Sequence, residues 1–203
     1  MKRAFYLAFS LFLGIILVQS CADKKPKPIK KNVQYVSGAD EVTYLKLGHE
    51  IADTVQKTLK LNLLEAIKAG GPLKAVTFCN SRALDLTSTY SRKYNTEVKR
   101  VTDRNRNPKN AANEMELKVL ADFNDKLEKG EPLSPKIAID SEGRKHFYAP
   151  IFTGGMCLSC HGNPKNIQPE TLAVIDSLYP KDNATNYTVD ELRGLWSIKF
   201  KNS

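Results

Sequence analysis

The stretch from residue 136 to residue 161 reads KIAIDSEGRKHFYAPIFTGGMCLSCH and sets the architecture of the chain. Lys136–Asp140 and His146–Phe152 are short runs rich in apolar residues, and the polar segment Ser141–Arg144 separates them. Two such runs joined by a short turn that contains glycine predict an antiparallel hairpin. The second run leads directly into two cysteines and a histidine.

Helical periodicity precedes this hairpin. Apolar side chains recur every three or four residues from Ala39 to Ala69, and Gly70-Gly71-Pro72 ends the run. The pattern predicts further helices at 73–94, 111–129 and 170–178, and strands at 97–102 and 195–200. Because helices come first and a small antiparallel sheet follows, we expect an α+β domain with long N-terminal helices packed on the sheet.

The composition is typical of one globular domain. The chain has 203 residues, of which 41% are hydrophobic and 26% are charged, as expected for a protein with a single core. The formal net charge is +9, but the lysines are scattered and no stripe of aromatic and basic residues occurs. The charge therefore predicts a solvated surface and no nucleic-acid partner.

The first twenty residues have the order of a secretory signal. Lys2 and Arg3 form a short positive region, and Ala4–Val18 is uncharged and dominated by Phe, Leu and Ile. This order predicts a signal peptide at residues 1–20. The fifteen uncharged residues are fewer than the roughly 20 that a membrane-spanning helix needs. We therefore expect a cleaved signal and an exported protein.

Cys21 follows a small residue in a segment that resembles a bacterial lipobox. The resemblance implies that Cys21 becomes the acylated first residue of the mature chain, and several acyl chains give stable membrane anchoring. The alternative is ordinary signal cleavage nearby, with Cys21 left as a stray thiol. Residues 21–38 begin with a Lys- and Pro-rich run that predicts an extended tether, so the domain spans 39–203. We expect a periplasmic or outer-membrane lipoprotein of a Gram-negative bacterium.

Cys157-Leu158-Ser159-Cys160-His161 is a C-x-x-C-H motif, the attachment sequence of c-type haem. Two thiols at this spacing can each bond one vinyl-derived carbon of the porphyrin, and His161 then supplies the proximal axial ligand of the iron. Two other uses of such cysteines fit less well. A redox pair normally opens a helix within a βαβ pattern, and a structural zinc site needs four ligands, for which only His49, His146 and Cys79 remain. We therefore expect one covalent haem c.

The second axial position is open to several residues. No methionine follows the haem motif, so the candidates are Cys79, His49, His146 and Met115, or an open position. Cys79 falls on the apolar face of its predicted helix and is left without a partner in an oxidising compartment. Iron would hold it as a thiolate. A buried free cysteine acting as a small hydrophobe is an equal alternative on these grounds.

Three stretches resemble one family of haem proteins. They are Ala75-Val76-Thr77-Phe78-Cys79-Asn80, the loop Arg106-Asn107-Pro108-Lys109-Asn110 followed by Glu114, and Tyr148-Ala149-Pro150-Ile151 leading into Cys157–Gly162. In this order they are similar to the Cys/His-ligated haem c domain family with a PAS-like fold, which also occurs as a sensor part of bacterial signalling proteins. The resemblance covers about 42–200.

The resemblance implies that Cys79 and His161 are the two axial ligands and that the sheet is PAS-like. It also makes Arg106 and Asn107 candidate contacts of the haem pocket. Their alternative role is a loop clasp made by bonds from side chain to backbone.

These expectations favour a low-potential, six-coordinate haem, because a thiolate ligand donates electron density and stabilises ferric iron. We expect one-electron transfer with a redox partner protein, or redox sensing, and no enzymatic activity. The alternatives are a sensor of NO, CO or O2 that works through displacement of Cys79, and a haem enzyme with a vacated distal site.

Overall fold

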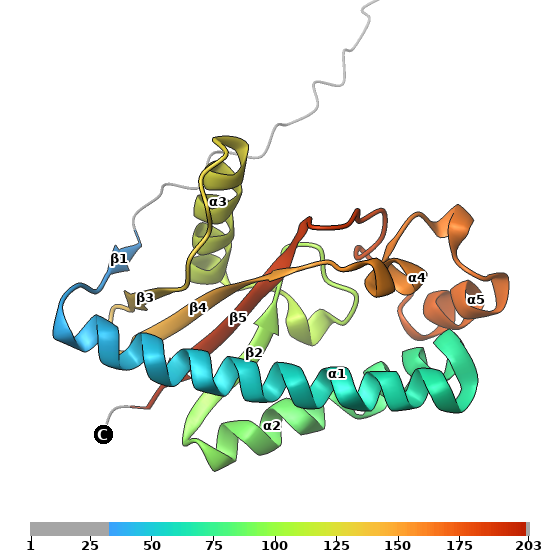
Figure 1. Cartoon of the computed structure of the whole chain (residues 1–203), viewed down its shortest axis with the longest axis horizontal. Coiled ribbons are helices and arrows are strands. Elements are labelled where there is room, and N and C mark those ends of the chain that lie inside the picture. Colours follow the sequence, from blue (N-terminus) through green and yellow to red (C-terminus); the bar gives the residue numbers. More distant parts are fainter. Residues whose placement is uncertain (1–32, 202–203) are drawn as a thin grey trace, which may run out of the picture.

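The computed structural model describes residues 33–201 (Figure 1). The predicted signal peptide at residues 1–20 and the predicted acylation site Cys21 lie outside the described residues. Within residues 33–201, no helix combines the length and the apolar character that crossing a membrane requires.

The sheet has five antiparallel strands in the order β1-β3-β4-β5-β2. The strands are β1 (Gln34–Tyr35), β2 (Thr96–Val101), β3 (Lys136–Ile139), β4 (Lys145–Phe152) and β5 (Leu192–Phe200). The predicted hairpin is confirmed as β3 and β4, with Ile137 opposite Phe147. The sequence placed Gln34 and Tyr35 in the tether, but they pair with Ile139 and Ala138 and form the edge strand β1.

Five α-helices accompany the sheet in the described part of the chain. They are α1 (Ala39–Ser81), α2 (Ala83–Lys93), α3 (Glu114–Glu128), α4 (Leu158–His161) and α5 (Pro169–Leu178), with short 3-10 turns η1 (Pro108–Asn110), η2 (Gly155–Cys157) and η3 (Pro164–Asn166). The α+β prediction is therefore confirmed.

The boundaries of the helices follow local backbone chemistry. Gly70 and Gly71 have non-helical backbone angles inside α1, so the predicted break is confirmed at that point. The helix expected at 73–94 is interrupted at Arg82, which separates α1 from α2. Helix α3 begins at Glu114 because Asn113 caps it and forms a capping box with Glu116.

Two apolar layers hold the sheet. Helices α1 and α2 cover one face, where Ile51 and Val55 pack near Phe147, and α3 covers the other face, where Phe123 packs near Tyr148 (Figure 1). Phe147 and Tyr148 enter opposite layers because successive side chains of a strand point to opposite faces. Helix α1 lies close against β4 at Gly48, where an added Cβ would come within 2.3 Å of the Phe147 ring.

The turn between β3 and β4 is fixed by Asp140. One carboxylate oxygen accepts hydrogen bonds from the backbone N–H groups of Glu142 and Arg144, and the other lies 2.8 Å from Arg144 Nε and 2.9 Å from His146 Nε2. Burial alone would raise the pKa of Asp140, but the hydrogen bonds from His146 and Arg144 outweigh it and hold the pKa well below its ordinary value.

This turn predicts a pH-dependent contribution to stability. A carboxyl group with a depressed pKa stabilises the folded state fully above its unfolded-state pKa of about 4, and the contribution is lost as the pH falls below that value. We expect Asp140→Asn to lower the free energy of unfolding by about 1 kcal/mol at pH 7, after allowance for solvent screening. The difference between the two proteins should shrink as urea denaturation is repeated at lower pH down to pH 3. A difference that stays constant with pH would contradict this role of the carboxylate.

Candidate functional site

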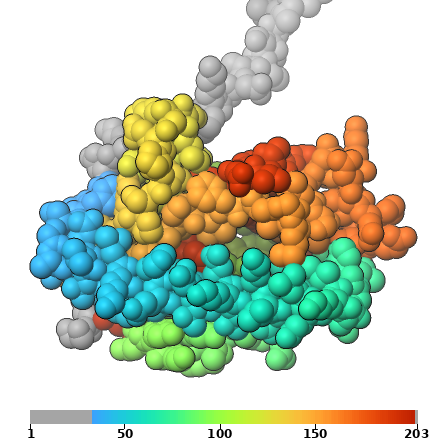
Figure 2. All heavy atoms as spheres, viewed as in Figure 1, coloured from blue at the N-terminus to red at the C-terminus, as the bar shows by residue number. Residues whose placement is uncertain are grey.

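A cavity of about 380 Å³ opens where the second half of α1, the ends of β2, β4 and β5, and α4 meet. Figure 2 shows a hollow between α1, in teal, and the orange segment that contains β4 and α4. Cys79, Cys157, Cys160 and His161 all line this cavity. Its volume lies within the range of about 300–1,000 Å³ that is usual for cofactor sites.

His161 is oriented by a backbone carbonyl. It ends the single-turn helix α4, and its Nδ1 lies 2.8 Å from the carbonyl oxygen of Ala184. Because that oxygen can only accept, Nδ1 carries the proton and Nε2 is left with a free lone pair. Burial, and then the positive charges of Arg106 and Arg193, lower the pKa of His161 to about 3. The side chain is therefore a neutral imidazole at physiological pH, which is the form that binds metals.

The two motif cysteines are thiols at the wall of the cavity. No disulfide joins Cys79, Cys157 and Cys160, the cysteines of the described residues. The backbone N–H of Gly154 lies 3.4 Å from Cys157 Sγ. Cys160 packs against the small apolar cluster of Val76, Ile175 and Tyr179, and burial raises the pKa of its thiol. The motif is thus anchored on the second half of α1 and on α5.

Cys79 reaches the same cavity from the second half of α1, beyond the Gly70–Gly71 break. It is solvent-accessible at the cavity wall, yet the surrounding protein raises the pKa of its thiol through desolvation. The positive charges of Arg100 and Arg106 oppose that rise. Cys79 and His161, the two axial ligands that the resemblance implied, therefore line the same cavity.

The other candidates for the second axial position lie elsewhere. The His49 side chain is 65% exposed and lies 3.7 Å from Asp53, and it does not line the cavity. His146 is bound to Asp140 in the β3–β4 turn, and Met115 packs on the α3 side of the sheet. Residues 33–201 also hold no group of three or more His, Cys, Asp or Glu side chains that could bind a metal ion, so the alternative zinc site is not assembled there.

Arg106 and Asn107 line the cavity, but their polar groups are engaged within the protein. Arg106 Nε lies 3.0 Å from a carboxylate oxygen of Asp182, and Arg106 Nη2 donates to the carbonyl oxygen of Cys160. Both members of the ion pair are nearly buried, with the Arg106 side chain 10% and that of Asp182 7% exposed. Asn107 caps η1 by accepting a hydrogen bond from the Lys109 N–H. Arg106 therefore ties the haem-motif helix to the segment before β5.

Sequence reasoning missed two further residues of the wall, Arg100 on β2 and Arg193 on β5. The pKa of each guanidinium is lowered, mainly by burial. Arg100 shares a face of β2 with Val98, whereas Arg193 lies at the start of β5, where the register with β4 shifts, and both reach the cavity wall only in the folded sheet. No local sequence signal identifies them.

The comparisons with known proteins agree with this architecture. The family model for Tll0287-like proteins matches residues 25–201. The chain belongs to the Tll0287-like family. A crystal structure of the cyanobacterial haem protein Tll0287 matches this Tll0287-like chain with a TM-score of 0.58 and 21% sequence identity, over 82% of this chain and 98% of that one. A search among curated proteins found no match. The likeness confirms the fold, which is consistent with the expected PAS-like domain.

Proposed function

We propose that this protein carries one covalent haem c in the cavity and uses it for one-electron transfer or redox sensing. The observation that carries the proposal is that Cys157, Cys160, His161 and Cys79 line one cavity. Membership of the Tll0287-like family and the fold shared with a haem protein support it. Haem would supply a one-electron couple at its iron, whose potential depends on the axial ligands.

The chain's own residues have distinct roles in this proposal. Cys157 and Cys160 would hold the haem covalently, since each thiol could add across one vinyl group, with sulfur bonded to one carbon and hydrogen to the other and no oxidant consumed. The carbonyl of Ala184 fixes the His161 ring, with Nδ1 protonated and Nε2 available as the proximal ligand. Cys79 would supply a second ligand to the iron, and a thiolate there would favour ferric iron and a low potential. With both axial positions held by protein groups, we expect no enzymatic activity.

Export and membrane attachment are part of the proposal. The positive and apolar residues 1–20 and the lipobox-like segment at Cys21 support an exported lipoprotein of a Gram-negative bacterium, held at a periplasmic or outer-membrane surface. The tether would leave the haem domain accessible to a redox partner protein.

A second candidate is sensing of a diatomic gas through displacement of Cys79. The observation that favours it is the position of Cys79 beyond the non-helical Gly70 and Gly71, because such a break separates the cysteine-bearing segment from the part of α1 that packs on the sheet. CO binding to the reduced protein distinguishes the candidates. Uptake of CO with loss of a native ligand supports sensing, and fast electron exchange without uptake supports electron transfer.

Covalent attachment is tested by mass spectrometry of the full chain after maturation with haem. We expect haem to remain on the wild-type chain after denaturation and to be absent from the Cys157→Ala/Cys160→Ala variant, because thioether bonds survive unfolding and axial bonds do not. Cys79→Ser is the matched control and should keep its covalent haem. A wild-type chain that loses its haem on denaturation, or a double variant that keeps it, would contradict the proposal.

A further inference from the structure

The cavity carries an excess of positive charge. Three arginines line it, namely Arg100, Arg106 and Arg193, and no aspartate or glutamate is found among the described residues of its wall. Arg106 is neutralised by Asp182 behind the wall. The other two guanidinium groups have no carboxylate within ion-pair distance in residues 33–201.

Arg100 is held in place by the sheet. It shares a face of β2 with Val98, which packs in the α1–α2 layer, and it stands opposite Trp196 of β5. The groups that act on its charge are Cys79, Arg193 and Tyr179, and desolvation acts most strongly. A desolvated cation without a counterion is costly, so this position favours an anionic occupant of the cavity.

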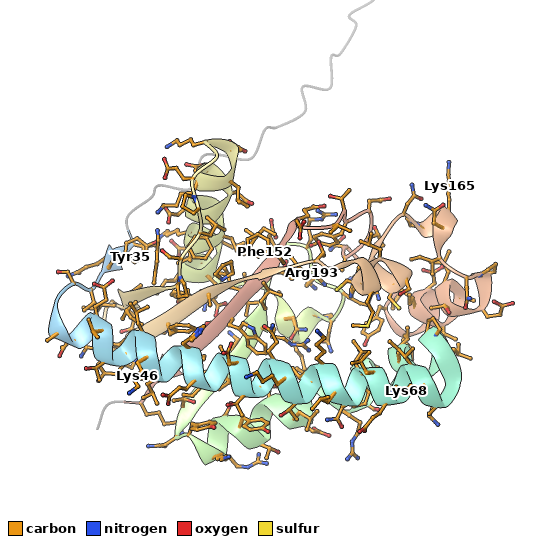
Figure 3. All side chains as sticks on the ribbon, in the orientation of Figure 1. Tyr35, Lys46, Lys68, Phe152, Lys165 and Arg193 are labelled. Atoms are coloured by element: carbon orange, nitrogen blue, oxygen red, sulfur yellow. The ribbon has the colours of Figure 1, made fainter. Side chains whose placement is uncertain are left out.

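Arg193 is placed by β5 at the same end of the sheet. Its Nη1 lies 3.3 Å from the carbonyl oxygen of Arg104 and 3.4 Å from the Tyr187 hydroxyl, and its guanidinium lies 4.8 Å from the centre of the Tyr187 ring. In Figure 3, Arg193 and Phe152 lie together where β5 begins and β4 ends. At the neighbouring Gly194, β5 approaches β2 closely, since an added Cβ there would meet the Val101 carbonyl oxygen at 2.4 Å.

We propose that Arg100 and Arg193 form a carboxylate-binding pair that holds the two propionate groups of haem. This inference rests on the proposed function. A guanidinium matches a carboxylate through parallel N–H···O bonds, and two unneutralised cations in one wall match a ligand with two carboxylates. The pairing of β2 with β5 fixes Arg100 opposite Trp196, and Arg193 lies at the start of β5, where the register with β4 shifts. Arg106, by contrast, is a positioning residue, because its guanidinium is already bound to Asp182 and to the Cys160 carbonyl.

The test compares binding of mesohaem and of mesohaem dimethyl ester to the full chain. Mesohaem has ethyl groups in place of vinyl groups, so it forms no thioethers and binds reversibly, and the ester lacks the two negative charges. We expect Arg100→Gln and Arg193→Gln each to weaken mesohaem binding about ten- to a hundredfold and to leave the affinity for the ester at its wild-type value. Arg92→Gln, on the exposed side of α2, is the matched control and should change neither affinity.

The other outcomes of this binding comparison overturn either the inference or the proposed function. If the glutamine variants lose affinity for both porphyrins equally, or for neither, the arginines do not bind the propionates and the inference is overturned. If the wild-type chain binds neither porphyrin, the proposed function itself fails. Where circular dichroism shows that a glutamine variant does not fold, the same binding comparison is made with Arg100→Lys and Arg193→Lys. They keep the charge but lose the planar fork, so they should weaken mesohaem binding by less and leave ester binding unchanged.

Discussion

Replacing Cys79 with methionine is expected to raise the reduction potential of the haem-loaded protein by more than about 0.1 V, since axial ligands move haem potentials over a span of about 0.8 V. A thiolate donates electron density to ferric iron, whereas a neutral thioether favours the ferrous state. Of the candidate ligands that the sequence offered, Cys79 is the one that shares the cavity with His161. The potential is measured by optical redox titration. The paramagnetic resonance spectrum of Cys79→Ser should also lose a low-spin, thiolate-type signal.

The control for this experiment lies one half-turn further along the same helix. Ser81 is exposed and bonds to the carbonyl of Thr77, and it does not line the cavity, so Ser81→Ala should leave the potential and the spectrum unchanged. If Cys79→Ser has the spectrum of the wild type, Cys79 is not bound to iron.

Replacing Glu116 with alanine is expected to lower the free energy of unfolding by about 2–4 kcal/mol, because it removes a buried carboxylate that accepts three hydrogen bonds. Its side chain is 2% exposed. One oxygen accepts from Ser197 Oγ at 2.7 Å and from Lys99 Nζ at 3.2 Å, and the other accepts from the backbone N–H of Asn113. The carboxylate thus joins α3 to β2 and β5 and closes the capping box of α3. Urea denaturation measures the change.

Glu114 provides the comparison within the same helical turn. Its side chain is 83% exposed and pairs only with Lys118, four residues along the helix. Exposed pairs of this kind contribute little, so Glu114→Ala should leave the free energy of unfolding close to its wild-type value. Equal effects of the two substitutions would show that the buried carboxylate does not join the layers as described.

Much of the fold can be predicted from short sequence patterns. The β3–β4 hairpin follows from two apolar runs around a glycine turn, and the break in α1 follows from Gly70-Gly71-Pro72, because both signals lie within a few residues. The interruption at Arg82 carries no glycine or proline and could not be predicted. Strand β1 has two residues, Gln34 and Tyr35, and becomes a strand only through pairing with β3.

The residues of the site also divide into those that a sequence pattern predicts and those that it does not. The C-x-x-C-H motif is recognised from consecutive residues of the sequence. Cys79 was identified through the resemblance to a family, and the structure places it at the same cavity. His49, one of the candidate ligands, lies away from the cavity because α1 contacts β4 through Gly48, which fits against Phe147. A glycine has no apolar side chain by which the sequence could indicate that contact. Arg100 and Arg193 were missed because their shared wall exists only once β2 and β5 are paired.

The central place of β5 in the sheet determines when the cavity can be completed. β5 is the last element of the described chain, yet it lies between β4 and β2 and pairs with both. Chains are synthesised from the N-terminus, so β2 has no neighbour in the sheet until the final strand has emerged. Pairing between segments so distant in sequence also folds slowly. The motif cysteines precede β5 and are therefore made before the strand that completes the cavity wall, so any chain that stops before β5 lacks that part of the wall.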